Sequence, residues 1–511
     1  MSTFTWITIA VYLGSMVAVG IYFSKKTKST SDYFLGGRKL GPIVTAMSSE
    51  ASDMSSWLLL GLPGVALAGG ICEASWTAIG LAIGTYLNFL FVAKRIRIYS
   101  DKIDAVTIPE FFSKRFGKEG KLLSVASAIV IIVFFIPYTA SGFNACGTLF
   151  NSLSGGRISY FTAMIISAAV IVTYTVLGGF MAVSKTDFVQ SAVMTVALIV
   201  VVGFGISYAG GWNAVVENAQ SLPSFTSLVS SYDYTTGGST EYGFLTILST
   251  LAWGLGYFGM PHILLRFMAI KDSAKLKLSR RIATVWVVIS MGVAILIGVI
   301  GSAVVNNGTI ALDMADSQRI IIEIAKKIGE SGALFAILTG LIISGILAST
   351  MSTSDSQLLA ASSSISNDIL GDVFGLKKSQ KTSMLISRIT IVVIAVIAVF
   401  WARNEGSVFT IVSFAWAGFG AAFGPVVLFS LFWKRTTKWG AFAGMVTGGA
   451  MVFIWKYLIA KLGGVFAIYE LLPAFVLACV AIVVVSLLTE KPDESVEATF
   501  DEVNAEMKAK A

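Results

Sequence analysis

The chain has 511 residues, of which 55% are hydrophobic and 13% are charged, and its mean hydropathy is +0.80. Because soluble globular proteins carry roughly 25% charged residues, this composition excludes an ordinary soluble protein. The formal net charge of +8 is concentrated in loops between apolar runs, so it bears on membrane orientation and not on nucleic-acid binding.

Long apolar runs recur along the whole chain. A membrane-spanning helix needs about 20 apolar residues, and these runs are continuous, which excludes the alternating pattern of a transmembrane β-barrel. We therefore predict an all-α polytopic membrane protein with thirteen transmembrane helices. The predicted spans are 5–24, 41–70, 74–93, 122–150, 158–180, 187–208, 244–269, 282–306, 333–360, 384–402, 406–433, 439–460 and 467–488.

The basic residues predict the orientation of these spans. No lysine or arginine precedes the first span, whereas Lys25, Lys26 and Lys28 follow it. If the loops alternate sides, seven of the 37 basic residues lie outside: Arg157, Arg319, Lys326, Lys327, Arg403, Lys456 and Lys461. Since cytoplasmic loops are enriched in lysine and arginine, we expect a multi-pass cytoplasmic-membrane protein with its N-terminus outside and its C-terminus inside.

Three connecting segments are polar. Two outer loops are expected at 209–243 and 307–332, and the second contains the amphipathic stretch IIIEIAKKI, which predicts a short interfacial helix. Residues 489–511 form a charged cytoplasmic tail, which we expect to be a mobile extension.

The second span, with the sequence TAMSSEASDMSSWLLLGLPG, is too polar to face lipid. A local break in the helix would free backbone carbonyl oxygens, and oxygen atoms are the ligands that hard cations such as sodium prefer. Asp53 would add negative charge nearby. The alternative is an unbroken helix buried in the bundle, with Asp53 paired with an arginine.

The seventh span, LAWGLGYFGMPHILLRFMA, is also weakened at mid-membrane, by three glycines and Pro261. Trp253 and Tyr257 are four residues apart and share a helical face. The two interrupted spans are five positions apart, as expected if two five-helix repeats each begin with a broken helix. This pairing indicates a transporter with its binding site near the membrane midplane.

The ninth span ends in clustered hydroxyls, GILASTMSTSDSQLLAASSS. Ser352 and Thr353 can coordinate a cation, or these hydroxyls can bond to carbonyls of the preceding turn. The chain has no phosphate-binding loop and one histidine, which argues against an ATP-driven pump and against an enzyme. A channel lined by polar midplane residues is the nearest alternative class.

Several motifs resemble the sodium/solute symporter family, and within it the bacterial members that carry proline. They are YFLGGRKLGP at 33–42, ASDMSSWLLLGLPG at 51–64, AWGLGYFGMPHI at 252–263, MST at 351–353 and SFAWAGFGAAFGPVVLFSLFW at 413–433. The resemblance implies a leucine-transporter-type core of 5+5 inverted repeats, formed by spans 2–6 and 7–11. The implied division is 1–40 for the first span and its loop, 41–208 and 244–433 for the repeats, and 434–488 for spans 12 and 13.

The resemblance also implies the functional residues. Sodium would bind the backbone carbonyls of Ala51, Met54 and Ser349 and the hydroxyls of Ser352 and Thr353, with Asp53 required for sodium coupling. Positions linked to proline are Ser55, Trp57, Tyr138, Trp253, Tyr257 and Pro261, and Arg38 and Asp187 fall at cytoplasmic gate positions.

We therefore expect a sodium-coupled L-proline transporter that works by alternating access in the lipid bilayer, with no nucleic acid and no obligate protein partner. A sodium symporter for another small solute (another amino acid, a sialic acid, a sugar or pantothenate) is the alternative. The sequence departs from the family pattern at three positions: Glu50 stands where a small residue is usual, Ser349 where alanine is expected, and Met260 where a polar residue precedes Pro261.

Overall fold

The computed structural model is almost entirely helical and describes residues 2–25, 27, 29–117, 120–373, 379–403 and 407–509. The helices of the N-terminal part are α1 (Thr3–Ser24), α2 (Thr30–Leu35), η1 (Gly36–Arg38), α3 (Pro42–Asp53), η2 (Trp57–Gly61), α4 (Leu62–Gly69), α5 (Ile71–Leu87), η3 (Asn88–Ala93), α6 (Lys94–Lys102), α7 (Ile108–Arg115), α8 (Lys121–Ser154) and α9 (Tyr160–Tyr208).

The rest of the chain adds one antiparallel hairpin, in which Ser230 pairs with Glu241. Its elements are α10 (Trp212–Ser221), β1 (Ser230–Asp233), β2 (Gly238–Glu241), α11 (Phe244–Leu251), η4 (Ala252–Gly259), α12 (Pro261–Ala269), η5 (Ser273–Lys275), α13 (Leu276–Asn306), η6 (Met314–Arg319), α14 (Ile320–Gly329), α15 (Ala333–Ser363), η7 (Ser364–Val373), α16 (Gln380–Trp401), α17 (Val408–Phe432), α18 (Lys438–Ile454), η8 (Trp455–Ile459), η9 (Ala460–Leu462), η10 (Gly464–Phe466), α19 (Leu471–Leu488) and α20 (Glu494–Ala509).

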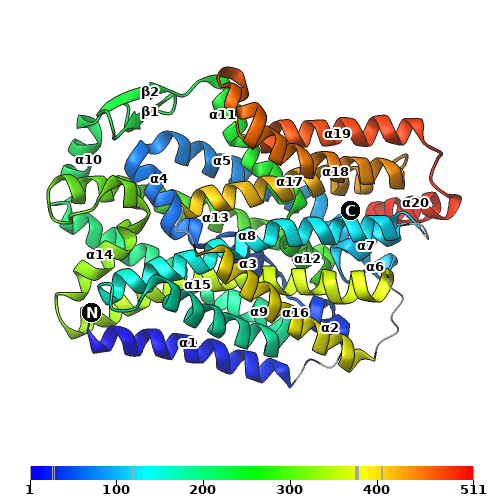
Figure 1. Cartoon of the computed structure of the whole chain (residues 1–511), viewed down its shortest axis with the longest axis horizontal. Coiled ribbons are helices and arrows are strands. Elements are labelled where there is room, and N and C mark those ends of the chain that lie inside the picture. The colour runs from blue at the N-terminus through cyan, green and yellow to red at the C-terminus, as the bar shows by residue number, and fades with distance from the viewer. Residues whose placement is uncertain are drawn as a thin grey trace.

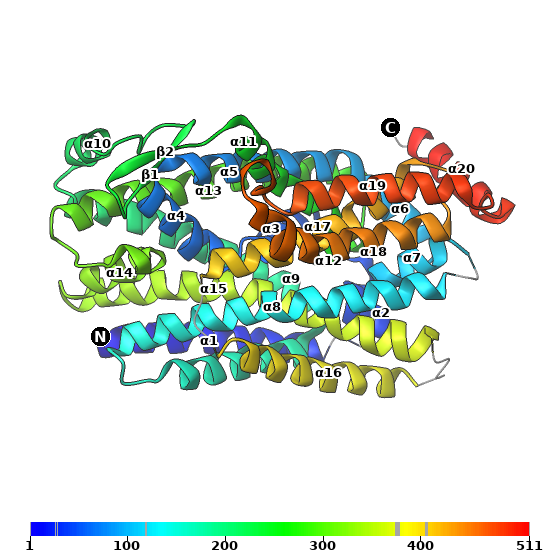
Figure 2. The same ribbon diagram turned by 45° about the horizontal axis from the view of Figure 1, so that its top comes forward.

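The long helices lie roughly along the longest axis of the molecule, as both views show (Figures 1 and 2). One end carries the N-terminus, α10, the β-hairpin and α14, and we call it the hairpin end. The opposite end carries α2, α7 and α20, and we call it the tail end. This arrangement is that of a helix bundle long enough to cross a bilayer.

In the described part of the chain, ten helices are long and apolar enough to cross a membrane. The pair formed by Phe244–Gly259 and Pro261–Ala269, bent by 47°, is an eleventh candidate. The predicted second span is not one of the ten, because it is divided into α3 and a shorter apolar helix at Trp57–Gly69.

The predicted fifth and sixth spans form one 49-residue element, α9. At about 1.5 Å per residue a straight helix of this length would far exceed a hydrocarbon core of about 30 Å. The element turns at Gly179, where φ is 62° and ψ is −165°. Near its two ends, Tyr160 donates to the carbonyl of Ala402 at 3.1 Å, and the carbonyl of Tyr208 accepts from Asn307 at 2.9 Å. Both of these contacts lie at the hairpin end, so α9 folds back on itself at a glycine.

Burial separates central from peripheral helices. In their most apolar windows, α15 is 72% buried and α17 is 78% buried, against 28% for α1 and 33% for α19. Where α5 meets η4, a Cβ on Gly84 would lie 2.4 Å from the carbonyl oxygen of Gly254. Small residues permit this backbone contact, which holds η4 in the centre of the bundle.

The amphipathic stretch at 320–328 is helical, as predicted, but it is not an interfacial helix with its apolar face in lipid. Ile320, Ile321, Ile322, Ile324 and Ile328 are all buried in the protein. The helix α14 packs on α15, and Glu323 accepts from Ser152 of α8 at 3.1 Å. Its apolar face therefore covers the hairpin end of the central helices.

The expectation of a mobile tail is wrong for residues 494–509, which form α20. Val496, Phe500 and Val503 are buried, and their spacing is that of one helical face. Lys434 forms ion pairs with Asp501 at 2.7 Å and with Glu497 at 3.1 Å. Hydrogen bonds from Lys434 to Asp501 and Glu497 raise the pKa of its ammonium group. The tail is thus docked on the tail end by an apolar stripe and ion pairs.

We predict that Phe500→Ala releases α20 from the bundle, because it removes the largest apolar contact of the stripe. In a background with the three native cysteines replaced by serine, Val503→Cys should resist a maleimide reagent and should react at least tenfold faster once Phe500→Ala is added. Ser495→Cys, on the exposed face, is the control and should react equally in both. Equal protection of Val503→Cys in both backgrounds would contradict this docking.

Candidate functional site

The helix α3 breaks inside the bundle, as the polarity of the second span predicts. Its last residue is Asp53, and Met54 leaves the helical region with φ of −74° and ψ of 66°. The Ser55 amide turns back to the carbonyl of Asp53 at 2.8 Å, and helix resumes at Trp57. The alternative of an unbroken helix with an Asp53–arginine pair is wrong, because Asp53 accepts a hydrogen bond from the phenol of Tyr257.

A second break faces the first. The 3-10 segment η4 ends at Gly259, Met260 is extended, and α12 begins at Pro261, which has no amide hydrogen to leave unsatisfied. The phenol of Tyr257, on η4, joins the two broken elements through Asp53. The polar ends of both broken helices therefore meet in the centre of the bundle.

Among the residues expected to hold sodium, Ser352 of α15 contacts Ala51 of α3 next to the first break, with Ser349 and Thr353 beside it on α15. The Ser352 hydroxyl donates to the carbonyl of Ala51 at 2.7 Å and lies 3.2 Å from the carbonyl of Ser349. Thr353 Oγ1 lies 3.3 Å from the same Ser349 oxygen. Met54, the fifth, lies at the break itself. The cluster offers only oxygen atoms, and these suit a hard cation.

The hydroxyls of the ninth span bond to carbonyls of the preceding turn, which is one of the two alternatives that the sequence left open. Ser349 donates its own hydroxyl to Ile346 O at 2.8 Å, so that only its carbonyl faces the cluster. Serine in place of alanine at 349 therefore does not change the oxygen presented to the cluster. Ser352, in contrast, reaches across to α3.

Aromatic side chains from three helices surround the second break. The ring centroids of Trp57 and Trp253 lie 6.2 Å apart, and those of Tyr257 and Trp416 lie 5.1 Å apart. Trp416 donates its indole N–H to the carbonyl of Trp253 at 2.7 Å. A Cβ on Gly256 would lie 1.9 Å from this indole nitrogen, so glycine is needed there. We call these four rings the aromatic cluster.

Trp416, Phe409 and Tyr469 were not predicted from the sequence as site residues. Trp253 packs against Phe409 at 5.2 Å and Tyr469 at 5.3 Å between ring centroids. Trp416 lies within the motif at 413–433, which was the available signal, whereas Phe409 and Tyr469 lie outside every motif. The predicted residue Tyr138 is buried, and its hydroxyl interacts with the side chain of Ser55. Ser55 is buried too.

A pocket of about 800 Å³ opens at the hairpin end. Its wall includes Gly61 of η2, Gly64 of α4, Asn144 of α8 and Phe409 of α17. The ring of Phe409, which lines this pocket, packs on Trp253, so one side chain lies between the pocket and the aromatic cluster.

Arg38 connects several elements at the tail end. Its guanidinium donates to the carbonyls of Met268 and Ala105, both at 2.8 Å, and pairs with Asp101 at 3.3 Å. Next to it, Leu40 forms a parallel bridge with Ile270. Arg38 therefore ties η1 to α6 and to the end of α12.

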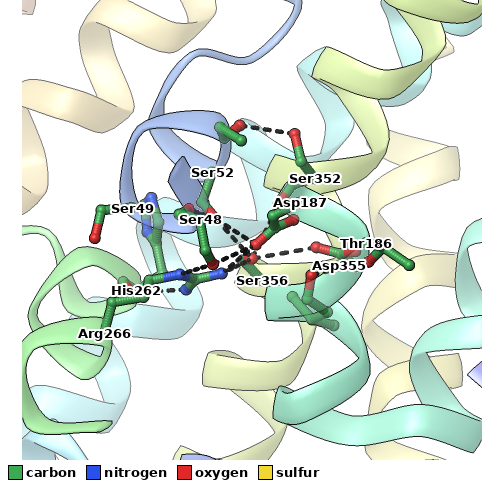
Figure 3. Close-up of polar contacts among 12 residues, drawn as sticks. Ser48, Ser49, Ser52, Thr186, Asp187, His262, Arg266, Ser352, Asp355 and Ser356 are labelled. Atoms are coloured by element: carbon green, nitrogen blue, oxygen red, sulfur yellow. Dashed lines mark hydrogen bonds and ion pairs between the residues drawn. The ribbon is translucent and has the colours of Figure 1, made fainter. Parts of the chain in front are cut away.

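Asp187, the other expected gate residue, belongs to a separate buried network (Figure 3). Its Oδ2 accepts from Arg266 at 2.9 Å, from Ser48 at 2.6 Å and from Ser52 at 3.2 Å. Arg266 also donates to Ser356 at 2.6 Å. The sequence predicted Asp187 as a gate residue but did not predict Arg266, because only the tertiary structure brings α12, α9, α3 and α15 together.

This network adjoins the sodium candidates. Ser52 follows Ala51 along α3, and Ser356 donates to the carbonyl of Ser352 at 2.9 Å. Ser52 and Ser356 are 3.1 Å apart. A change of position at the break of α3 therefore reaches Arg266 through direct contacts.

The profile of the sodium:solute symporter family matches residues 33–448. The chain belongs to this family. It is 43% identical over 504 residues to the sodium/proline symporter of Haemophilus influenzae, covering 97% of this chain and 96% of that protein. It is 42% identical over 489 residues to the osmoregulated proline transporter of Bacillus subtilis, covering 95% of each. Members of the family are transporters coupled to sodium, so this symporter is not an enzyme.

Two solved structures share its fold. A Na+-coupled sialic acid symporter in a substrate-bound outward-open state superposes with a TM-score of 0.77 at 18% identity, covering 96% of this chain and 99% of that one. A nucleobase-cation-symport-1 family transporter in a closed conformation gives 0.55 at 14% identity, covering 93% and 98%. The leucine-transporter-type fold of the symporter, expected from the sequence, is confirmed.

We predict that the buried pair of Arg266 and Asp187 stabilises the symporter only as a pair. Removing one partner of such a pair costs about 3–5 kcal/mol, since the other charge is left buried and unpaired. Arg266→Met and Asp187→Asn should each lower the thermal unfolding temperature of the detergent-purified protein, and the double variant should recover most of the loss. Arg281→Met, an exposed arginine of α13, is the control. Additive losses in the double variant would contradict the pairing.

Proposed function

We propose that this symporter takes up L-proline together with sodium by alternating access across the cytoplasmic membrane. The observation that carries this proposal is the hydrogen bond from Ser352 of α15 to the carbonyl of Ala51 next to the break of α3, with Ser349 and Thr353 adjacent to Ser352 on α15. It occurs in a chain whose relatives at 42–43% identity are named proline transporters.

The proposed topology has thirteen transmembrane helices. The ten long helices are joined by the bent pair α11–α12, the broken pair α3–α4 and the second arm of α9. The N-terminus and hairpin end lie outside, and the C-terminus and tail end lie inside, because the basic clusters then lie in the cytoplasm. Two inverted repeats, 41–208 and 244–433, form the core. They are flanked by 1–40, the outer loop 209–243, the last two spans at 434–488 and the cytoplasmic tail 489–511.

In the proposed sodium site, the carbonyls of Ala51, Met54 and Ser349 and the hydroxyls of Ser352 and Thr353 surround the ion. Bound there, sodium would hold α3 against α15, in place of the direct Ser352–Ala51 hydrogen bond. Asp53 couples this site to the solute site, since it ends α3 and binds Tyr257 of η4.

The solute site lies between the two breaks. Trp57, Trp253, Tyr257 and Tyr138 wall the apolar ring of proline, and Ser55 lies beside them. The helix that begins at Pro261 and the one that begins at Trp57 point their N-termini toward the break region. The partial positive charge of these N-termini suits the carboxylate of the solute.

Gating follows from which end of the bundle is closed. The contacts of Arg38 and the network of Asp187 close the tail end, while the pocket of about 800 Å³ opens at the hairpin end. This arrangement supports an outward-facing state. Sodium and solute drive the exchange of states by binding them with different affinities. A tenfold sodium gradient is worth about 1.4 kcal/mol, and 100 mV is worth about 2.3 kcal/mol per charge.

Uptake into right-side-out vesicles tests the proposal. Labelled proline should accumulate when external sodium is added and should not accumulate with potassium, because the site depends on a small hard cation. A tenfold excess of unlabelled proline should abolish uptake, and equal excesses of other amino acids, a sialic acid, a sugar or pantothenate should not. Equal uptake with potassium would remove the sodium claim, and stronger inhibition by another solute would change the substrate.

Variants at the sodium site give a second test. Ser352→Ala and Thr353→Ala should each raise the sodium concentration for half-maximal uptake about tenfold, the equivalent of about 1.4 kcal/mol, by removing an oxygen ligand. Asp53→Asn should do the same through Tyr257. Ser344→Ala is the matched control, because this buried serine of α15 bonds only to its own helix, at Gly340. A shift as large in Ser344→Ala would assign the effect to helix packing.

A further inference from the structure

We propose that Glu50 and Asp53 form a second sodium site, on the side of α3 that faces η4. The proposal rests on the proposed sodium-coupled uptake and adds a second ion to it. It starts from Glu50, a buried carboxylate of α3 next to Ala51.

The side chain of Glu50 is buried, with 1% of its surface exposed. Neither of its carboxylate oxygens has a hydrogen-bond partner among the residues that the structure describes. Buried polar groups are nearly always paired, and an isolated buried carboxylate is costly. An unpaired glutamate in the centre of the bundle therefore indicates a ligand.

Two further oxygen atoms without partners lie in the same region. Asp53 is one helical turn from Glu50, and the charges of the two residues interact. Asp53 Oδ2 accepts from Tyr257, but its Oδ1 has no partner within the described ranges. Asn88 donates its amide N–H to the carbonyl of Tyr257 at 3.0 Å, which leaves its Oδ1 equally unpaired. Glu50 also interacts electrostatically with Tyr257, around which all three residues are grouped.

The packing of α5 on η4 explains this grouping. Gly84 and Gly254 bring the two backbones into contact, and Asn88 lies one turn beyond Gly84. Asn88 is therefore placed beside Tyr257, on the side of α3 that carries Asp53. The unpaired oxygens come from α3 and η3, so a bound ion would join two elements to η4.

Asp187, which is equally buried, lies 2.9 Å from Arg266. Asp53 accepts a hydrogen bond from the phenol of Tyr257, whereas neither oxygen of Glu50 has a donor among the described residues. Glu50 therefore carries a carboxylate without a partner there, and one monovalent cation would neutralise its charge.

The ligand set is carboxylate and amide oxygen, which selects a hard cation over a soft one. This second site is distinct from the first. Ala51 meets Ser352 of α15, whereas Asp53 meets Tyr257 of η4. Since successive residues of a helix are turned by about 100°, Ala51 does not share the face of Glu50 and Asp53. The second ion would hold Tyr257, a residue of the solute site, in place.

The experiment is a flux ratio in proteoliposomes that contain the purified full-length protein. Uptake of sodium-22 and of labelled proline is measured in parallel at a fixed membrane potential. The wild type should move two sodium ions per proline, and its sodium dependence should have a Hill coefficient near two. Glu50→Gln, which keeps the shape but loses the charge, should reduce both values to about one. Glu323→Gln is the matched control, a glutamate paired with Lys326 far from the site, and should keep the ratio of two.

The remaining outcomes overturn either the second sodium site or the proposed function. A wild-type ratio of one sodium per proline, with or without acidification of the vesicle interior, overturns the second sodium site and leaves the proposed function intact. Absence of sodium-driven proline uptake in the wild type overturns the proposed function instead. If Glu50→Gln does not fold, Glu50→Asp keeps the charge on a shorter side chain. It should retain the ratio of two with at least a threefold weaker apparent sodium affinity, and an unchanged affinity would overturn the site.

Discussion

The helical hydrogen bonding of α3 stops at Asp53, in the middle of a bundle that excludes water, and the rest of the site depends on this interruption. Backbone carbonyls released there cannot be left unpaired in the membrane interior. Ser352 of α15 takes one of them, and the phenol of Tyr257 takes the carboxylate at the helix end. The same break thus connects α3 to two different neighbours, and this makes it a place where ion and solute binding can influence each other.

Charge is distributed unevenly around this break. Toward the tail end, Asp187 Oδ2 is bonded by Arg266 and by two serines of α3. Toward η4, neither carboxylate oxygen of Glu50 has a hydrogen-bond partner among the described residues. The helix α3 therefore contacts a buried ion pair through Ser48 and Ser52 and carries an unpaired carboxylate at Glu50. The first suits a fixed contact that closes a path, and the second suits an exchangeable cation.

The two ends of the molecule differ in the same way. Arg38 binds backbone carbonyls at the tail end, where α20 adds an apolar stripe and ion pairs to the neighbouring α6. The hairpin end has a pocket instead. Alternating access requires that such contacts break and reform, and polar contacts between backbone and side chain do so at lower cost than tightly packed apolar surfaces.

The sequence by itself determined the class of protein, most of the long apolar helices and the two broken helices, because hydropathy and the polarity of a span are local properties. It also determined the family, since the motifs are contiguous runs of residues. The sequence also predicted the reversal between the fifth and sixth spans, which the structure places at Gly179. Only the tertiary structure decided that α14 and α20 are covered by protein, that Arg266 pairs with Asp187, and that Glu50 is buried. These depend on contacts between different helices, such as that of Arg266 with Asp187, and hydrophobic periodicity carries no information about which face of one helix meets which face of another.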